Sequence, residues 1–251
     1  SAGDGDGYDN NPDDVGDGTV STGGTRSSSF HGTHVAGTIA ATSNNGTGIS
    51  GVAWGAKIMP LRALGRSGGT SYDIEQAMRY AGGLSNDSGT VPTQIADVVN
   101  MSLGGSGFSR SNQDVVSELR EAGVLFIAAA GNSAISSPFY PASYDGVVSV
   151  SSVGFDSSAL APYSNYGAYI DIAAPGGNSS VDANGDGFPD GVLSTLGTDS
   201  GEFVFGFLQG TSMASPHVAG VVALMRSVNP SLTPDQLDYI ITNGEMSHDL
   251  G

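Results

Sequence analysis

The sequence predicts an α/β fold, in which a doubly wound, mostly parallel sheet carries helices on both faces. Short apolar strand patterns alternate along the chain with helical patterns, as is typical of such sheets. Residues 124–130 are continuously apolar, as expected of a strand that is covered on both faces. The length of 251 residues is sufficient for one domain with a large core. Glycine, at 39 residues, has about double its usual share, which predicts many tight turns.

The charge of the chain excludes several classes of partner. There are 8 basic and 25 acidic residues, which gives a net charge of −17. Nucleic acids and anionic membranes would be repelled, so we expect neither as a partner. The chain has no cysteine, and its longest apolar run, 124–130, is too short to span a bilayer. The N-terminus is rich in Gly and Asp rather than basic and then apolar, so it is not a signal peptide.

The periodicity of apolar residues places the elements in order. Helices are predicted at 31–41, 71–84, 112–122 and 233–243, and a further one begins at about residue 212. Strands are predicted at 57–63, 97–101, 124–130, 147–153 and 169–173.

The segment 210–220 reads as a tight turn that leads directly into a helix. The helix is apolar nearly all round, so we expect it to be buried. Ser212 stands at its positive end, where a developing negative charge would be stabilised. Most serines at this position cap the helix instead, so the pattern leaves both roles open. Pro216 is expected in the first turn, where its missing N–H costs nothing.

The segment 31–41 predicts a second buried helix, with His31 at its start. A single histidine in this place could be a hydrogen-bonded core residue. A histidine and a serine that each open a buried helix form, in outline, a base and a nucleophile.

Together, His-Gly-Thr-His at 31–34 and Gly-Thr-Ser-Met-Ala-Ser-Pro-His at 210–217 resemble the signatures of the subtilisin-like serine proteases, the subtilases. Almost the whole chain follows that family's order of landmarks. The resemblance implies a bacterial, secreted, extracellular serine endopeptidase that cleaves extended polypeptides through an acyl-enzyme. It makes His31 the base and Ser212 the nucleophile, with Asn132 as a donor to the oxyanion. By residue type alone, Asn132 would be an ordinary turn former.

The resemblance also implies where a polypeptide substrate binds. Ser67, Gly68 and Gly69 would form an exposed edge to which the substrate adds as a strand, and residues without bulk permit that approach. A plain glycine turn is the alternative. The two walls of the primary specificity pocket would be formed by Ser102, Leu103, Gly104, Ala129 and Gly131. Phe139 would lie near the pocket floor and make it shallow, and the bond between Tyr140 and Pro141 would be cis.

The segment 182–190 predicts a calcium loop from its own residues. Oxygen ligands alternate and a glycine occupies position six, although position twelve is Leu193 rather than an acid. Oxygen-only ligands favour a hard cation, and a Gly/Asp hairpin is the alternative. The expected ligands are Asp182, Asn184, Asp186, Phe188 through its carbonyl, and Asp190.

Two further loops are candidates for structural calcium. Near the N-terminus, Asp4, Asp6, Asn10 and Asp13 fit part of a twelve-residue calcium loop, and a solvated acidic segment is the alternative. By resemblance to the family, the loop 42–51 would bind calcium through Asn45 and the carbonyls of Thr47 and Ile49.

The family's third catalytic residue, an aspartate in an Asp-Ser/Thr-Gly motif after a central strand, has no counterpart before His31. None of the acidic residues there follows an apolar strand, so none is nominated. We therefore expect residues 1–251 to be a single, monomeric subtilisin-like peptidase domain, truncated at both edges and partnered by an upstream segment that carries the aspartate.

Two other functions remain open. A catalytically dead, protease-like binding domain would explain the missing aspartate. An acidic calcium-binding adhesive module would explain the Asp-rich loops but not the segment 210–220. In addition, the single lysine, the abundant glycine and the net charge of −17 predict adaptation to salt or cold.

Overall fold

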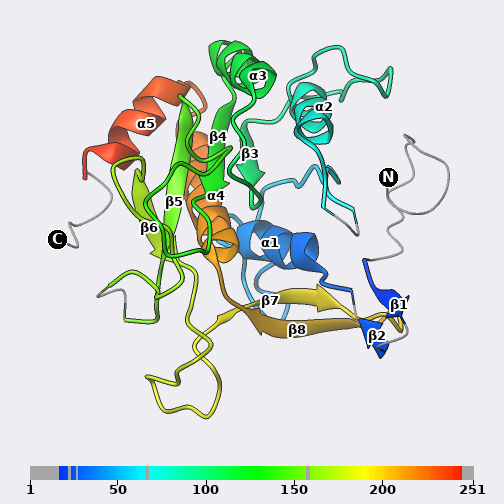
Figure 1. Cartoon of the computed structure of the whole chain (residues 1–251), viewed down its shortest axis with the longest axis vertical. Helices are drawn as coiled ribbons and strands as arrows, with labels where there is room; N and C mark the ends of the chain where they lie inside the picture. The colour runs from blue at the N-terminus through cyan, green and yellow to red at the C-terminus, as the bar shows by residue number, and fades with distance from the viewer. Residues whose placement is uncertain (1–16, 22–23, 27, 66–67, 157–158, 245–251) are drawn as a thin grey trace.

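The computed structural model describes residues 17–21, 24–26, 28–65, 68–156 and 159–244. Its centre is a four-stranded sheet in the order β3-β4-β5-β6, in which all neighbouring strands are parallel (Figure 1). The predicted parallel α/β architecture is confirmed. The strands are β3 (Val98–Met101), β4 (Leu125–Ala129), β5 (Val147–Val153) and β6 (Ile172–Pro175).

Helices cover both faces of this sheet. On one face, α2 (Ser71–Ala81) and α3 (Arg110–Glu121) pack over β3 and β4. On the other face, α4 (Thr211–Val228) and α5 (Pro234–Thr242) cover β4, β5 and β6. Side chains along β4 alternate between the two cores: Phe126 faces the first and Ile127 faces the second, as the pleat of a strand requires. A central strand buried on both faces therefore has to be apolar throughout, as β4 is.

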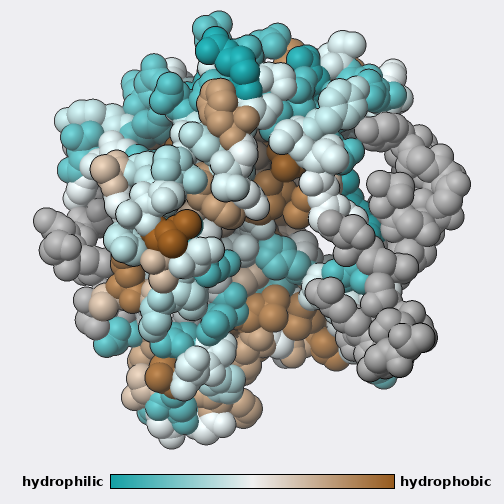
Figure 2. Space-filling view, in the orientation of Figure 1, coloured by the Kyte–Doolittle hydropathy of each residue, from teal (hydrophilic) through white to brown (hydrophobic). Residues whose placement is uncertain are grey.

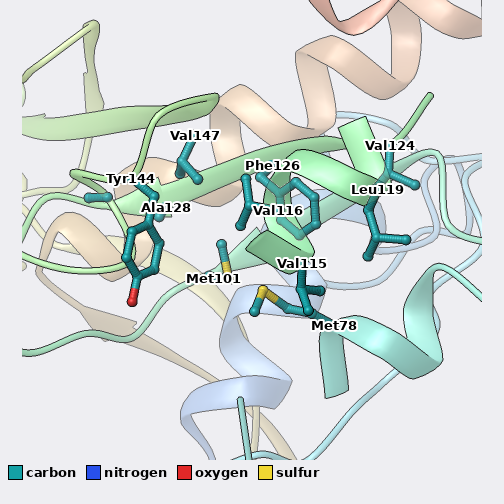
Figure 3. Close-up of a cluster of buried hydrophobic side chains, with 11 residues drawn as sticks. Met78, Met101, Val115, Val116, Leu119, Val124, Phe126, Ala128, Tyr144 and Val147 are labelled. Carbon is teal, nitrogen blue, oxygen red and sulfur yellow. The ribbon is translucent and has the colours of Figure 1, made fainter. Parts of the chain in front are cut away.

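The first core shows how this packing is achieved. Figure 3 shows the side chains of α2, α3, β3 and β4 pointing toward one another between the helices and the sheet. Phe126 fills the centre, and Leu119 from α3 and Met78 from α2 close over it. Each of these side chains is at least 98% buried, and burial of such a group stabilises the fold by about 1.5–3 kcal/mol.

An antiparallel hairpin lies beside the helix that carries His31. Strands β7 (Val192–Gly197) and β8 (Phe203–Leu208) pair with each other and pack against α1 (His31–Ala40), as Figure 1 also shows. A shorter pair, β1 (Thr19–Ser21) and β2 (Gly24–Arg26), is also antiparallel. Neither pair was predicted. Hydrophobic side chains gather over β7 and β8 (Figure 2), and Phe203 is 95% exposed.

Two predicted strands need correction. Residues 57–63 do not form a strand, because no described strand lies beside them to pair with their backbone groups. The strand predicted at 169–173 begins three residues later, at Ile172, where pairing with β5 starts. Within the described ranges, none of the helices combines the length and apolarity needed to cross a membrane.

Candidate active site

Ser212 is the second residue of α4, and its side chain does not cap the helix. The N-cap position belongs to Gly210, at φ 144°, which has no side chain to contribute. The Ser212 hydroxyl is half-buried and points toward the carbonyl of Ser102, at 3.4 Å. The Ser212 hydroxyl therefore does not cap the helix and makes one long hydrogen bond, to a backbone carbonyl.

Pro216 does not lie in the first turn, as the sequence had indicated, but is the sixth residue of α4. In an α-helix its nitrogen would bond to the carbonyl four residues earlier, which is that of Ser212. Because proline has no N–H, that carbonyl needs another donor. The Ser102 hydroxyl supplies it at 2.7 Å and itself accepts a hydrogen bond from Asn100 Nδ2 at 3.0 Å. The end of β3 is thus bonded to the residue at the start of α4 that the sequence nominated as nucleophile.

Asn132 lies against the turn that precedes Ser212. Its Oδ1 accepts hydrogen bonds from the N–H and the hydroxyl of Thr211, at 2.8 and 2.9 Å. These bonds fix the orientation of the amide and leave Nδ2 as the outward donor of an exposed side chain. A carbon placed at the Cβ position of Gly210 would lie 3.4 Å from Asn132 Nδ2 and 3.6 Å from the Ser212 nitrogen. Two nitrogen donors thus lie near one point beside Gly210, with Asn132 Oδ1 at 3.7 Å from the same point. An oxyanion site requires two such donors directed at one oxygen.

His31 is the first residue of α1, which packs against α4. Burial lowers the pKa of the His31 imidazole below its usual 6.5, and the carboxylate of Asp17 opposes this by raising it. The imidazole is therefore neutral near pH 7 and could accept a proton. In the described part of the chain, no hydrogen bond joins His31 to the Ser212 hydroxyl, so their pairing stays a prediction.

Asp17 is one of the acidic residues before His31 that the sequence did not nominate. Its carboxylate accepts a hydrogen bond from the N–H of Ser29 at 2.5 Å, two residues before His31. Asp17 follows a long acidic run and precedes a strand rather than following one, so its sequence context gave no signal of this contact.

The hairpin holds the first turns of α1 through His34. The buried Nε2 lies 2.9 Å from the carbonyl of Val192 and 3.2 Å from that of Gly206, so Nε2 must carry the proton. The hydroxyl of Ser194 in turn donates to the His34 carbonyl at 2.7 Å. Burial lowers the pKa of His34, which keeps it neutral. These bonds give His34 a structural role in holding α1 against the hairpin.

The two predicted pocket walls come together around Phe139. Gly105 and Tyr140 exchange backbone hydrogen bonds of 2.8 and 2.7 Å, which join the loop after β3 to the loop after β4. A Cβ at Gly104 would overlap the Phe139 ring, and one at Gly131 would lie 3.1 Å from it. The ring therefore occupies the space between the walls. These walls contain Ser102, Leu103 and Gly104 after β3, Ala129 at the end of β4, and Gly131. The predicted cis bond between Tyr140 and Pro141 is confirmed.

The edge predicted to receive the substrate is only partly described. Ser67 lies outside the described residues, whereas Gly68 and Gly69 are exposed. Gly68 exchanges backbone hydrogen bonds of 3.0 and 2.9 Å with Gly65, so its own N–H and C=O are occupied within a turn. Strand addition at this edge stays a prediction.

The loop 182–190 wraps its backbone around carboxylate oxygens. Asp182 accepts hydrogen bonds from three successive N–H groups, those of residues 185–187, at 2.8–3.1 Å. Asp190 is buried and accepts one from Ala183 at 2.6 Å. Asp186 accepts one from Phe188 and another from the amide of Asn184, at 2.8 and 3.0 Å. The residues predicted as ligands here thus lie on one turn, but Asp182, Asp186 and Asp190 are not grouped in a way that could hold a metal ion in the described structure.

The structure shows less about the other predicted metal ligands. Asn45 is exposed, and its Oδ1 accepts a hydrogen bond from the Thr47 N–H at 3.1 Å, within the loop that also contains Ile49. Asp4, Asp6, Asn10 and Asp13 lie outside the described residues. Among the residues that the structure describes, no three His, Asp or Glu side chains are grouped in a way that could hold a metal ion.

Known proteases are similar to this chain in sequence. The sequence profile of the subtilase family matches residues 4–247. An "Extracellular protease" of Xanthomonas campestris is 42% identical over 86% of this chain and 36% of its own length. An "Extracellular basic protease" of Dichelobacter nodosus is 39% identical over 100% of this chain and 43% of its own length. The chain therefore spans less than half the length of each of these relatives.

Solved structures show the same similarity. A protease from Pseudoalteromonas arctica is 44% identical, with a TM-score of 0.88 over 96% of this chain and 72% of that one. A cold adapted subtilisin-like serine proteinase is 32% identical, with a TM-score of 0.64 over 85% of this chain and 67% of that one.

Proposed function

Because this chain belongs to the subtilase family, we propose that the protein is a serine endopeptidase that hydrolyses peptide bonds in extended polypeptides. The observation that supports the proposal is that Asn132 Nδ2 and the Ser212 nitrogen lie 3.4 and 3.6 Å from one point beside Gly210, at the start of α4. Two donors beside a serine hydroxyl that makes only a long hydrogen bond suit acyl transfer better than plain binding.

In the proposed mechanism, Ser212 Oγ attacks the carbonyl carbon of the scissile bond while His31 takes the hydroxyl proton. The negative charge that forms on the carbonyl oxygen is stabilised by Asn132 Nδ2–H, by the Ser212 N–H and by the positive end of α4. His31 then gives its proton to the leaving amine, and an acyl-enzyme forms on Ser212. Water, activated by the same imidazole, hydrolyses that ester.

The position of Phe139 supports a preference for small side chains at the residue before the cleaved bond. Its ring already occupies the space between Gly104 and Gly131, which a large substrate side chain would need. The substrate backbone would lie along the Ser102–Gly104 segment.

The proposal is tested with Ser212→Ala in the protein expressed from its complete reading frame. We expect the unmutated protein to cleave casein and to react with a fluorophosphonate at Ser212, and the variant to do neither. The exposed Ser137, replaced by alanine, provides the matched control and should retain both activities. Retained cleavage by Ser212→Ala would refute the mechanism. Failure of the unmutated protein to be labelled would instead support a protease-like binding domain.

We further propose that the loop 182–190 binds a structural calcium ion. Carboxylate, amide and carbonyl oxygens alternate within one turn, and such a set suits a hard cation better than a softer transition metal. Asp182, Asn184, Asp186, the Phe188 carbonyl and Asp190 would hold the ion, and Asn45 with the carbonyls of Thr47 and Ile49 would form a second site. When bound, calcium would neutralise the carboxylates and stabilise the fold, without taking part in the reaction.

Calcium binding is expected to raise the melting temperature. Calcium at 100 times its dissociation constant should stabilise the folded chain by about 2.7 kcal/mol per site. Calorimetric titration of Asp182→Ala should show one ion fewer than titration of the unmutated protein or of Asp114→Ala, which alters an exposed aspartate on α3. An unchanged stoichiometry in Asp182→Ala would exclude a calcium site in this loop.

Finally, we propose that the protein is secreted. Two of its relatives are named extracellular proteases. Millimolar calcium outside the cell would fill even sites of modest affinity.

A further inference from the structure

Asn165 lies behind the loop that presents Asn132, and it is completely buried. Its backbone is anchored to the central sheet, because its carbonyl accepts a hydrogen bond from the hydroxyl of Ser151 in β5 at 2.7 Å. A second hydroxyl, that of Ser164, donates to the same carbonyl at 3.0 Å. The side chain of Asn165 therefore starts from a rigid base and not from a surface loop.

The side chain and N–H of Asn165 bind four backbone groups of the loop 130–135. Its Nδ2 donates to the Ala130 carbonyl at 2.8 Å, and its own N–H donates to the Gly131 carbonyl at 2.9 Å. Its Oδ1 accepts hydrogen bonds from the N–H groups of Ser133 and Ile135, at 2.9 and 3.3 Å. These partners lie on both sides of Asn132, so the loop is held before and after that residue.

The fit between this side chain and the loop is close. Gly131 has a φ of +105°, and a Cβ there would overlap Asn165 Nδ2, so both the conformation and the space require glycine. The loop is therefore seated directly on the amide of Asn165. Asn132 itself makes no hydrogen bond with Asn165 in the described structure and instead binds Thr211.

We propose that Asn165 is a positioning residue for the oxyanion donor: it fixes residues 130–135 so that Asn132 Nδ2 faces the space beside the Ser212 N–H. This inference rests on the proposed peptidase function. Displacement of a catalytic group by about 1 Å can cost up to 10²-fold in rate. Loss of Asn165 should therefore lower kcat and leave KM nearly unchanged, because the oxyanion forms only after the substrate has bound.

The test compares Asn165→Ala and Asn165→Asp with the unmutated protein, using a chromogenic peptide substrate. Asn165→Asp keeps the acceptor for Ser133 and Ile135 but places a negative oxygen against the Ala130 carbonyl. We expect kcat to fall about tenfold or more in both variants, with KM changed less than about twofold. In the background of Asn132→Ala, adding Asn165→Ala should lower kcat by less than about twofold, because the donor that Asn165 positions is already gone.

Asn86 provides the matched control. Its amide also holds a turn, donating to the carbonyls of Leu84 and Thr90 at 2.9 and 2.8 Å, and neither partner is one of the site residues. Asn86→Ala should lower the free energy of unfolding without changing kcat. Equal losses of kcat for Asn165→Ala with and without Asn132, or a loss confined to KM, would overturn the positioning role.

A readout independent of activity separates this inference from the proposed function. A crystal structure of Asn165→Asp should show residues 131–135 displaced and the bonds between Asn132 and Thr211 broken. An unmoved loop would refute the positioning role even in an active protein. A displaced loop in a protein that does not cleave peptides would support it and refute only the peptidase proposal.

Discussion

At the scale of single residues, the site depends on which hydrogen-bonding atoms are already occupied. Asn132 offers Nδ2 outward because Thr211 holds its Oδ1 with two donors. In subtilisin, loss of one such oxyanion donor costs about 10²–10³ in turnover, and we expect a comparable loss for Asn132→Ala. The Ser212 hydroxyl is not used as a cap, because Gly210 occupies the N-cap position of α4.

The protonation of His31 gives a prediction about pH. Burial lowers its pKa below 6.5, so the neutral, proton-accepting form persists to lower pH than in an ordinary histidine. On the acid side of the pH profile, the fall of kcat/KM (its acid limb) should therefore be centred below pH 6.5. Asp17→Asn removes a charge that raises this pKa, so the limb should move to still lower pH. A limb that moves upward in Asp17→Asn, measured from kcat/KM against pH, would contradict this assignment.

Phe139 gives a prediction about specificity. Replacement of Phe139 by glycine removes the ring between Gly104 and Gly131 and opens the pocket. We expect kcat/KM for peptides with Phe before the cleaved bond to rise relative to peptides with Ala, by about tenfold or more, since each buried methylene contributes roughly 0.8 kcal/mol. A peptide library with one variable position would measure the ratio. An unchanged ratio would mean that the ring does not limit the pocket.

At the scale of elements, α4 is tied to β3 through the carbonyl that Pro216 leaves without a donor. Ser102→Ala removes the hydroxyl that satisfies this carbonyl, and we expect a loss of about 1 kcal/mol in the free energy of unfolding. Pro216→Ala restores an N–H in the helix, so the double variant should lose less than Ser102→Ala alone.

Urea unfolding of the two single variants and the double variant measures this coupling. Ser137→Ala, an exposed serine, serves as the reference for a substitution without a buried partner. Strictly additive losses would show that Ser102 and the helix N–H do not compete for the Ser212 carbonyl.

The elements also show what periodicity can and cannot predict. Residues 124–130 had to form a buried strand, because a continuous apolar run of that length suits a parallel sheet covered on both faces. The hairpin β7–β8 was not predicted, although Phe203, Phe205 and Phe207 alternate along β8 with the period of two that is typical of a strand. Residues 57–63 have strand composition, but a strand exists only where another strand pairs with it.

The residues of the site also fall into those that the sequence could predict and those that it could not. The resemblance to the subtilase signatures nominated Ser212, His31 and Asn132, and the structure places Asn132 beside the residue before Ser212. Asn165 and Asp17 could not be nominated, because their roles depend on hydrogen bonds and charges between segments that are distant or unpatterned in the sequence.

At the scale of the whole molecule, the net charge of −17 makes the folded chain repel itself. Raising the salt concentration from 0.1 to 1 M shortens the screening length from about 10 to 3 Å, so the melting temperature should rise. Sucrose at matched osmolality separates screening from solute exclusion. A melting temperature that is indifferent to sodium chloride would remove the case for adaptation to salt.

Asn165 and Thr211, which hold Asn132 and its loop, lie about 30 and 79 positions farther along the chain. The ring of His34 binds carbonyls that are more than 150 residues away. Within residues 1–251, the groups that hold Asn132 and its loop are therefore synthesised after Asn132 itself. If the proposed peptidase function holds, the amide can be oriented only once Thr211 has docked against it, so the ability to cleave would arise late in the folding of this segment.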